Sequence, residues 1–331
     1  MKTVVIGSGS WGTALAQVLC DNHEEVMIYG NCNEQIDDIE QNHRNSMFFE
    51  GVELNPDLHA TMDVNVVADA DVVVLSVPTI AIESVCLQID PLLEKSVIFV
   101  NTSKGFHPTT NERISEVIRK NISPDHLRSV VSLIGPSHAE EVVIRLLTAI
   151  CAVSLNDEDA KTIQHLFSNE YFRVYTGNDE IGSETGVALK NAIALASGVL
   201  SGLGYGDNTR AALMTRGLAE MIRFGVAMGG KKETFNGLTG IGDLIVTCSS
   251  MHSRNFQAGY EIGKANDAQV YWKYNKKTVE GVRTAKVAHE LAQKMGVDMP
   301  IINEIYSVLY ENKDPKQSAR DLMLRDLKAE E

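Results

Sequence analysis

Several features that would define whole classes of protein are missing from this chain of 331 residues. No apolar run approaches the roughly 18 residues of a membrane-spanning helix, and Met1-Lys2 leads into the first apolar stretch without a signal-peptide segment. The five cysteines are scattered without a Cys-x-x-Cys pair, and the nine histidines show no metal-ligand spacing. We therefore expect a cytoplasmic protein with reduced thiols, no disulfide framework and no metal.

Positive charge is also scarce, with 30 Lys and Arg against 44 Asp and Glu and a net charge of −14. This balance argues against nucleic acid and against an anionic membrane surface as partners. An anionic ligand would have to bind through a local cluster of basic side chains and backbone N–H groups. Basic residues in structured, apolar surroundings are therefore informative here.

The first half of the chain alternates between apolar runs and helical patterns. Continuous Val- and Ile-rich runs are typical of strands buried on both faces, as in a parallel sheet covered by helices. The expected strands are residues 3–6, 26–29, 71–77, 97–101, 129–134, 148–154 and 171–175. The expected helices are residues 13–22, 33–41, 80–87, 110–120 and 157–167. The pattern predicts an α/β domain with a Rossmann-type doubly wound sheet.

Beyond about Gly182 the strand signal nearly disappears, and helix-length patterns separated by Gly-rich turns continue to the end. We predict a dinucleotide-binding Rossmann-type domain at 1–181 and an all-helical substrate and catalytic domain at 182–331. No long flexible linker separates them, and a cleft between two such domains is a natural place for a substrate.

A glycine-rich turn, Gly7-Ser-Gly9-Ser-Trp-Gly12, follows the first expected strand and precedes helix-forming residues. In a dinucleotide site the first glycine permits a tight turn, the second lets the backbone approach a pyrophosphate, and the third lets the helix pack closely. The N–H groups at the helix N-terminus then face the anion. The turn predicts a dinucleotide site, and the alternative is a glycine-rich turn before an ordinary helix.

A second informative segment contains Lys190, Asn191 and Ser197 as the only polar residues between Gly186 and Gly198. A helix that is apolar nearly all round is buried, and lysine is rarely buried without a partner. Desolvation would favour proton exchange by such an amine. The alternative is a lysine whose side chain reaches the surface.

Other candidate residues follow expected strands or glycine-rich turns. Lys104, and the segment Gly135-Pro-Ser137, directly follow two strands, and ligands of open α/β sheets bind beyond such strand ends. A solvated loop lysine and an ordinary helix-capping turn are the alternatives. Asp243 ends a glycine-rich turn and could hold an ammonium or a hydroxyl, or could cap a helix. Ser253-Arg254-Asn255 opens a helix and would suit a phosphate, although an exposed Arg after a Ser cap is common.

Taken in order, these segments resemble the bacterial type of the NAD(P)-dependent glycerol-3-phosphate dehydrogenase family. The motifs that carry the resemblance are the 7–12 turn with Trp11, Ser-Lys104-Gly, Gly135-Pro-Ser137-x-Ala139, Leu-Lys190-Asn191, the 202–210 segment, Gly240-Ile-Gly-Asp243-Leu, Ser253-Arg254-Asn255 and Val279-Glu280-Gly281. The resemblance implies reversible reduction of dihydroxyacetone phosphate to sn-glycerol 3-phosphate with NAD(P)H. It also implies a supply of glycerophospholipid backbones, and a homodimer.

The same resemblance implies roles for individual residues. Lys190 becomes the proton donor and acceptor, Asp243 orients it, and Lys104 holds the carbonyl or hydroxyl side of the substrate. The implied substrate-binding residues are Lys104, Gly135, Ser137, Lys190, Asn191, Asp243, Ser253, Arg254 and Asn255. The implied cofactor-binding residues are Gly7, Gly9, Ser10, Trp11, Gly12, Asn31, Lys104, Ala139, Arg254, Thr278 and Glu280.

Three positions depart from the family pattern. The second strand is followed by Gly30-Asn31-Cys32, with neither an acid for a ribose 2′-hydroxyl nor an Arg or His for a 2′-phosphate, so NADH and NADPH both stay open. Glu50 stands where the family often has Pro, and Arg145-Leu-Leu-Thr148 replaces the usual Gly-x-Pro-Thr. Another β-hydroxyacid-type dehydrogenase is one alternative function, and a non-catalytic NAD(P)H-binding sensor is the other.

Overall fold

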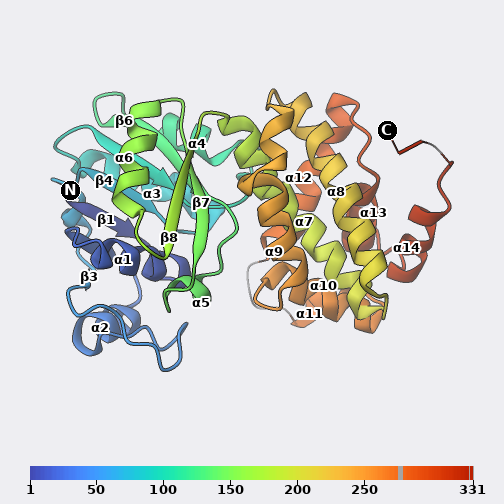
Figure 1. Cartoon of the computed structure of the whole chain (residues 1–331), viewed down its shortest axis with the longest axis horizontal. Coiled ribbons are helices and arrows are strands. Elements are labelled where there is room, and N and C mark those ends of the chain that lie inside the picture. The colour runs from blue at the N-terminus through green and yellow to red at the C-terminus, as the bar shows by residue number, and fades with distance from the viewer. Residues whose placement is uncertain (275–278, 328, 331) are drawn as a thin grey trace. The chain divides into compact units, whose positions relative to one another are not determined.

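The computed structural model describes residues 1–274, 279–327 and 329–330 (Figure 1). It divides into two compact units, Met1–Glu184 and Thr185–Glu331. The division lies inside one helix, α7 (Glu180–Gly202), whose first turns belong to unit 1 and whose remainder belongs to unit 2.

Unit 1 is built on an eight-stranded sheet in the order β3-β2-β1-β4-β5-β6-β7-β8. Every residue of β1, β4 and β5 is buried, as expected for strands covered on both faces. The strands are β1 (Thr3–Ile6), β2 (Val26–Tyr29), β3 (His59–Thr61), β4 (Val72–Leu75), β5 (Val97–Asn101), β6 (Leu127–Ile134), β7 (Thr148–Val153) and β8 (Phe172–Gly177). The doubly wound sheet predicted from the apolar runs is confirmed.

Two details of the sheet differ from the prediction. The edge strand β3 has only three residues and no apolar run, so its sequence contains no strand signal. The strand β7 runs antiparallel to β6, whereas the other neighbouring pairs are parallel. A parallel connection needs a long crossover, but the link between β6 and β7 contains only the one-turn helix α5 (Ala139–Val142).

Helices cover both faces of this sheet (Figure 1). On β1, Val5 belongs to one apolar cluster with the helices α1 and α6, while Val4 and Ile6 belong to the other with α3 and α4. The alternation follows from the two-residue period of a strand. The helices are α1 (Ser10–Asp21), α2 (Asn33–Asn42), α3 (Ile82–Ile89), α4 (Ile114–Asn121) and α6 (Asp157–Phe167), with 3-10 turns at Val64–Val67, Thr79–Ala81 and Asp90–Leu92.

The described residues of unit 2 contain helices and no strand. After α7 come α8 (Asp207–Ala227), α9 (Asp243–Ser249), α10 (Arg254–Ala265), α11 (Gln269–Tyr274), α12 (Glu280–Met295), α13 (Pro300–Tyr310) and α14 (Pro315–Met323), with short turns at Lys232–Asn236 and Leu238–Gly242. In the part of the chain that the structure describes, no helix is long and apolar enough to cross a membrane.

Helices α7 and α10 of unit 2 touch backbone to backbone. A Cβ added at Gly198 would lie 2.1 Å from the carbonyl oxygen of Phe256, and one at Gly259 would lie 2.0 Å from that of Leu195. Any larger side chain at either glycine would push the helices apart. This close approach brings the first turn of α10 beside Asn191, the residue next to Lys190.

Candidate active site and cofactor-binding site

The glycine turn between β1 and α1 has the shape that a dinucleotide pyrophosphate requires. Gly7 has φ of +113°, and a Cβ there would lie 2.3 Å from the Ser76 carbonyl oxygen. A Cβ at Gly12 would meet the Gly7 carbonyl oxygen at 2.0 Å, whereas a Cβ at Gly9 would meet nothing within 4 Å. The helix α1 begins at Ser10 with Gly9 as its N-cap and no side-chain cap. The backbone is thus close-packed below the turn and open at Gly9, which fits an anion at the helix N-terminus.

Residues from neighbouring loops hold this turn in place. The Asn45 Nδ2 donates to the Ser8 carbonyl oxygen and to Thr13 Oγ1, both at 2.9 Å, and Asn45 is buried. Ser8 Oγ donates to Gln35 Oε1 at 2.7 Å. Trp11 packs, partly buried, against the apolar cluster on this face. The support from Asn45 was not predicted, because one asparagine in a loop carries no local signal.

The end of β2 lies beside the same turn. Gly30 is buried, and a Cβ there would lie 2.4 Å from Ser8 Oγ. The exposed Asn31 follows, and α2 then begins at Asn33. The sequence of α2 contains no basic residue and four acidic ones, Glu34, Asp37, Asp38 and Glu40. The helix α2 therefore brings no positive charge to the segment that follows β2.

Lys104, Gly135 and Ser137 meet where β5 and β6 end. The Lys104 Nζ donates to the Gly135 carbonyl oxygen at 2.5 Å and to Ser137 Oγ at 3.3 Å. The hydroxyl of Ser137 also donates to the Gly135 carbonyl oxygen, at 3.1 Å. Gly135 has φ of +151°, a conformation that disfavours a side chain, and the buried Ala139 begins α5 just beyond. A cation therefore stands at the strand ends, where ligands of such sheets bind.

In unit 2, Lys190 lies inside the helical core with a carboxylate partner. Its Nζ donates to Asp243 Oδ1 at 3.0 Å and to Thr247 Oγ1 at 2.7 Å. The side chains of Lys190 and Asp243 are only 6% and 1% exposed, so this lysine does not reach the surface. An ammonium carries three N–H donors, and among the described residues the third one on Lys190 has no hydrogen-bond partner.

Helix α9 supplies both partners of Lys190. Asp243 and Thr247 are one turn apart, and Thr247 Oγ1 donates to the Asp243 carbonyl oxygen at 2.6 Å. Thr247 was not predicted, because a threonine in an apolar helix is common. Burial raises the pKa of the adjacent Cys248 to about 12, so its thiol is neutral and is no nucleophile. This leaves Lys190 as the candidate proton-exchanging group of the cluster.

The first turn of α10 joins α7 to α12. The Asn255 Nδ2 donates to Asn191 Oδ1 at 2.9 Å, and Asn255 Oδ1 accepts from the Gly281 N–H at 2.8 Å. Ser253 caps α10, with its hydroxyl oxygen accepting from the Phe256 N–H at 3.2 Å.

The residues beside this junction complete the predicted set. Arg254 is exposed and has no hydrogen-bond or ion-pair partner among the described residues, so it is available to an anion. Glu280 begins α12 beside Gly281, while Thr278 lies outside the described residues.

A Rossmann-type unit with a pyrophosphate turn and a helical unit with a buried lysine–carboxylate pair define the class of protein, an NAD(P)-dependent oxidoreductase. A family model described as the NAD-dependent glycerol-3-phosphate dehydrogenase N-terminus matches residues 2–160. The corresponding C-terminus model matches residues 179–320. The chain therefore belongs to the NAD-dependent glycerol-3-phosphate dehydrogenase family.

Individual relatives agree with this assignment. The chain is 50% identical over 330 residues to a glycerol-3-phosphate dehydrogenase (NAD(P)+) of Enterococcus faecalis, covering 99% of this chain and 97% of that one. It is 46% identical over 330 residues to one from Listeria monocytogenes, covering 99% and 98%. The crystal structure of glycerol-3-phosphate dehydrogenase from Coxiella burnetii is similar with a TM-score of 0.91 and 31% identity, covering 98% and 99% of the two chains.

Proposed function

We propose that this enzyme interconverts dihydroxyacetone phosphate and sn-glycerol 3-phosphate, with Lys190 as proton donor in reduction and proton acceptor in oxidation. The observation that carries the proposal is the Lys190 ammonium, buried and held by Asp243 and Thr247 through two of its three N–H groups. The third N–H is left for a substrate oxygen. Family membership supports the substrate pair.

When bound, NAD(P)H supplies the hydride that adds to the C2 carbonyl carbon. As negative charge develops on the carbonyl oxygen, Lys190 Nζ gives that oxygen a proton, so a C–H and an O–H bond form while the π bond is lost. Lys190 is left as a neutral amine and regains its proton from water. Asp243 and Thr247 keep Nζ in one orientation throughout.

The remaining predicted residues bind the ligands. In unit 2, Ser253, Arg254 and Asn255 hold the substrate phosphate beside Asn191. The support for this role is the exposed Arg254 guanidinium at the start of α10, which has no partner in the described part of the chain. In unit 1, Lys104 with Gly135 and Ser137 holds polar oxygens of the substrate. The residues assigned to the cofactor are Gly7, Gly9, Ser10, Trp11, Gly12, Asn31, Lys104, Ala139, Arg254 and Glu280.

The test of Lys190 uses Lys190→Met, with Lys294→Met on the exposed face of α12 as control. Turnover of dihydroxyacetone phosphate should fall by about 10²- to 10⁴-fold in K190M while K294M stays at the wild-type rate. Because K190M leaves Asp243 buried without its cation, thermal unfolding is measured too, and K190M/D243N is included to remove both charges. Near-wild-type turnover in K190M or in the double variant would show that another group donates the proton.

Arg254→Ala tests the phosphate site separately. It should chiefly raise KM for dihydroxyacetone phosphate, by roughly tenfold or more, since it removes a charge-assisted contact to the phosphate. An equal loss with an unphosphorylated ketone would contradict this role. Assays with 2-oxo acids separate the other β-hydroxyacid-type dehydrogenases, and a cofactor sensor would oxidise no NADH with any of these substrates.

We further propose a homodimer in the cytoplasm that supplies glycerophospholipid synthesis. Family resemblance supports the dimer and the pathway, and the five free cysteines support a reducing compartment. Light scattering on the purified protein tests the dimer, and a monomeric mass would contradict it.

A further inference from the structure

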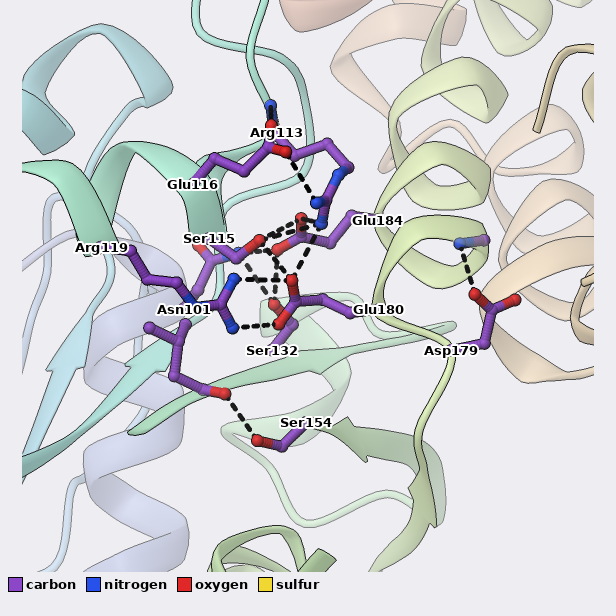
Figure 2. Close-up of polar contacts among 12 residues, drawn as sticks. Asn101, Arg113, Ser115, Glu116, Arg119, Ser132, Ser154, Asp179, Glu180 and Glu184 are labelled. Atoms are coloured by element: carbon purple, nitrogen blue, oxygen red, sulfur yellow. Dashed lines mark hydrogen bonds and ion pairs between the residues drawn. The ribbon is translucent and has the colours of Figure 1, made fainter. Parts of the chain in front are cut away.

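Unit 1 contains a buried cluster of charged side chains that the proposed chemistry does not use (Figure 2). Glu180 and Glu184 lie on the first turns of α7. They face Arg113, which is the N-cap residue of α4, and Arg119, which lies within α4. Arg119 donates to both carboxylate oxygens of Glu180, at 2.8 and 2.6 Å. Arg113 Nη1 donates to Glu180 Oε1 at 2.9 Å and to Glu184 Oε2 at 3.1 Å.

The cluster contains two guanidinium groups and three acidic side chains, because Glu116 Oε1 also accepts from Arg113 Nη2, at 2.9 Å. Burial, and then the charge of Glu180, raise the pKa of the Glu184 carboxyl. Burial opposes the ionisation of Glu180 as well, but hydrogen bonds from Arg119 and Arg113 lower its pKa below the usual value. Both acids lie at the N-terminus of α7, where the helix dipole favours negative charge. The cluster therefore anchors the start of α7 on unit 1.

The two carboxylates differ in what else they touch. Glu180 is bonded to Arg113, Ser115 and Arg119, all of which belong to α4 or its N-cap. Glu184 shares Arg113 and Ser115 but also reaches the sheet. Its Oε1 accepts from Ser132 Oγ on β6 at 2.7 Å and from Asn101 Nδ2 on β5 at 3.3 Å.

These sheet contacts stand directly behind the pair of Lys104 and Gly135. Asn101 is the last residue of β5, and its Oδ1 accepts from the Ser103 N–H at 3.0 Å. Ser103 is followed by Lys104, whose ammonium donates to the Gly135 carbonyl oxygen just beyond the end of β6. One carboxyl group thus bonds the last residue of β5 and a residue close to the end of β6, the two strands that carry this pair.

We propose that Glu184 is a positioning residue that fixes Lys104 against Gly135 through Asn101 and Ser132. The inference depends on the proposed role of Lys104 at the substrate. Glu184 holds the two strand ends in register, so the ammonium meets the substrate oxygen without reorganisation. Glu180 anchors α4 in the same way but contacts neither Asn101 nor Ser132, which makes it the matched control.

The test compares Glu184→Gln with Glu180→Gln. Each variant keeps the side-chain shape and replaces a carboxyl group with an amide, and a Gln at 184 turns an NH2 group toward one of the donors that now face a carboxyl oxygen. E184Q should lower kcat by roughly tenfold to a hundredfold, the effect of a misplacement of about 1 Å, and the NADH dissociation constant in a fluorescence titration should change by much less than kcat. E180Q should lower the thermal midpoint at least as much and leave kcat within about twofold of wild type.

A second pair covers the case in which E184Q does not fold. Ser132→Ala removes the contact to β6, and Ser115→Ala removes a contact to both carboxylates without touching the sheet. S132A should reduce kcat and S115A should not.

Lys104→Ala is measured in the same assays. Suppose that K104A loses turnover, but that kcat falls in proportion to the loss of stability in both E184Q and E180Q. Only the positioning role is then overturned, and the same holds if S132A and S115A show that proportion. If K104A keeps wild-type turnover, the proposed role of Lys104 and the positioning role both fail.

Discussion

Glu220 on α8 should make the free energy of unfolding of this protein depend on pH. The substitution Glu220→Gln should remove that dependence. Its carboxylate is buried, at 1% exposure, and accepts from the Ile301 and Ile302 N–H groups at 2.7 and 3.2 Å, at the start of α13. Burial outweighs these two bonds and raises the pKa from 4.5 to about 7. The folded protein therefore holds the proton more tightly than the unfolded chain does.

The direction of the pH dependence follows from this difference in pKa between the folded and unfolded states. The stabilising contribution is fully present below pH 4.5 and is lost as pH rises through about 7, because the buried group must then ionise. The gap between 4.5 and about 7, at about 1.4 kcal/mol per pH unit, lowers the free energy of unfolding by about 3 kcal/mol between pH 4.5 and 8. Glu220→Gln keeps one acceptor oxygen and does not titrate, so the bond that it loses costs the same at every pH.

Denaturant unfolding followed by circular dichroism at pH 4.5 and pH 8 measures the effect. The free energy of unfolding of E220Q, relative to wild type, should increase by about 3 kcal/mol between these pH values. Glu261→Gln, an exposed carboxylate on α10, is the control and should follow the wild type at both values. If E220Q and wild type lose or gain stability in parallel, Glu220 is ionised in the folded state across this range and the reasoning is wrong.

Two further predictions concern the departures from the family pattern. Asn31 is exposed and α2 contains no cation, so this region should disfavour the added negative charge of a 2′-phosphate. We expect kcat/KM to be at least about tenfold higher with NADH than with NADPH. Asn31→Arg should narrow that ratio. A preference of the wild type for NADPH would refute this. Arg145 has φ of +64° and pairs with both Asp21 oxygens, at 2.8 and 3.0 Å. Arg145→Ala should be less stable in thermal unfolding than Arg145→Gly by about 1 kcal/mol, because both lose the ion pair and only glycine relieves the strain; equal midpoints would contradict this.

The fold was predictable wherever a strand is buried on both faces, because β1, β4 and β5 then consist of apolar residues throughout. The edge strand β3 was not, since only its central Ala60 is buried and no run of apolar residues marks it. The direction of β7 was missed for a different reason. Side-chain alternation does not distinguish parallel from antiparallel pairs, and the one signal was the absence of a helical pattern between β6 and β7 that could form a crossover.

The site residues also divide into those that the sequence signals and those that it does not. An apolar helix that contains one lysine is predicted to bury that lysine, and the structure shows Lys190 buried. Lys190 and its partner Thr247 are 57 residues apart in the sequence, and Arg113 and Glu184 are 71 residues apart. No local spacing therefore signals either pair. In addition, the charges of α4 are typical of a solvated helix face, and only the tertiary structure shows that Arg113 points inward.

On the roles proposed for Lys190 and Arg254, one charge attracts the substrate and another takes part in its chemistry. Lys190 is paired with Asp243 in the core, so together they contribute little net charge to a protein whose total is −14. Arg254 has no partner among the described residues and stands at the N-terminus of α10, where the helix dipole adds to its charge. An anionic phosphate should therefore be drawn chiefly by Arg254. Added salt should then raise KM for dihydroxyacetone phosphate in wild type and in K190M/D243N alike, and much less in R254A. A salt dependence that survives in R254A would place the attracting charge elsewhere.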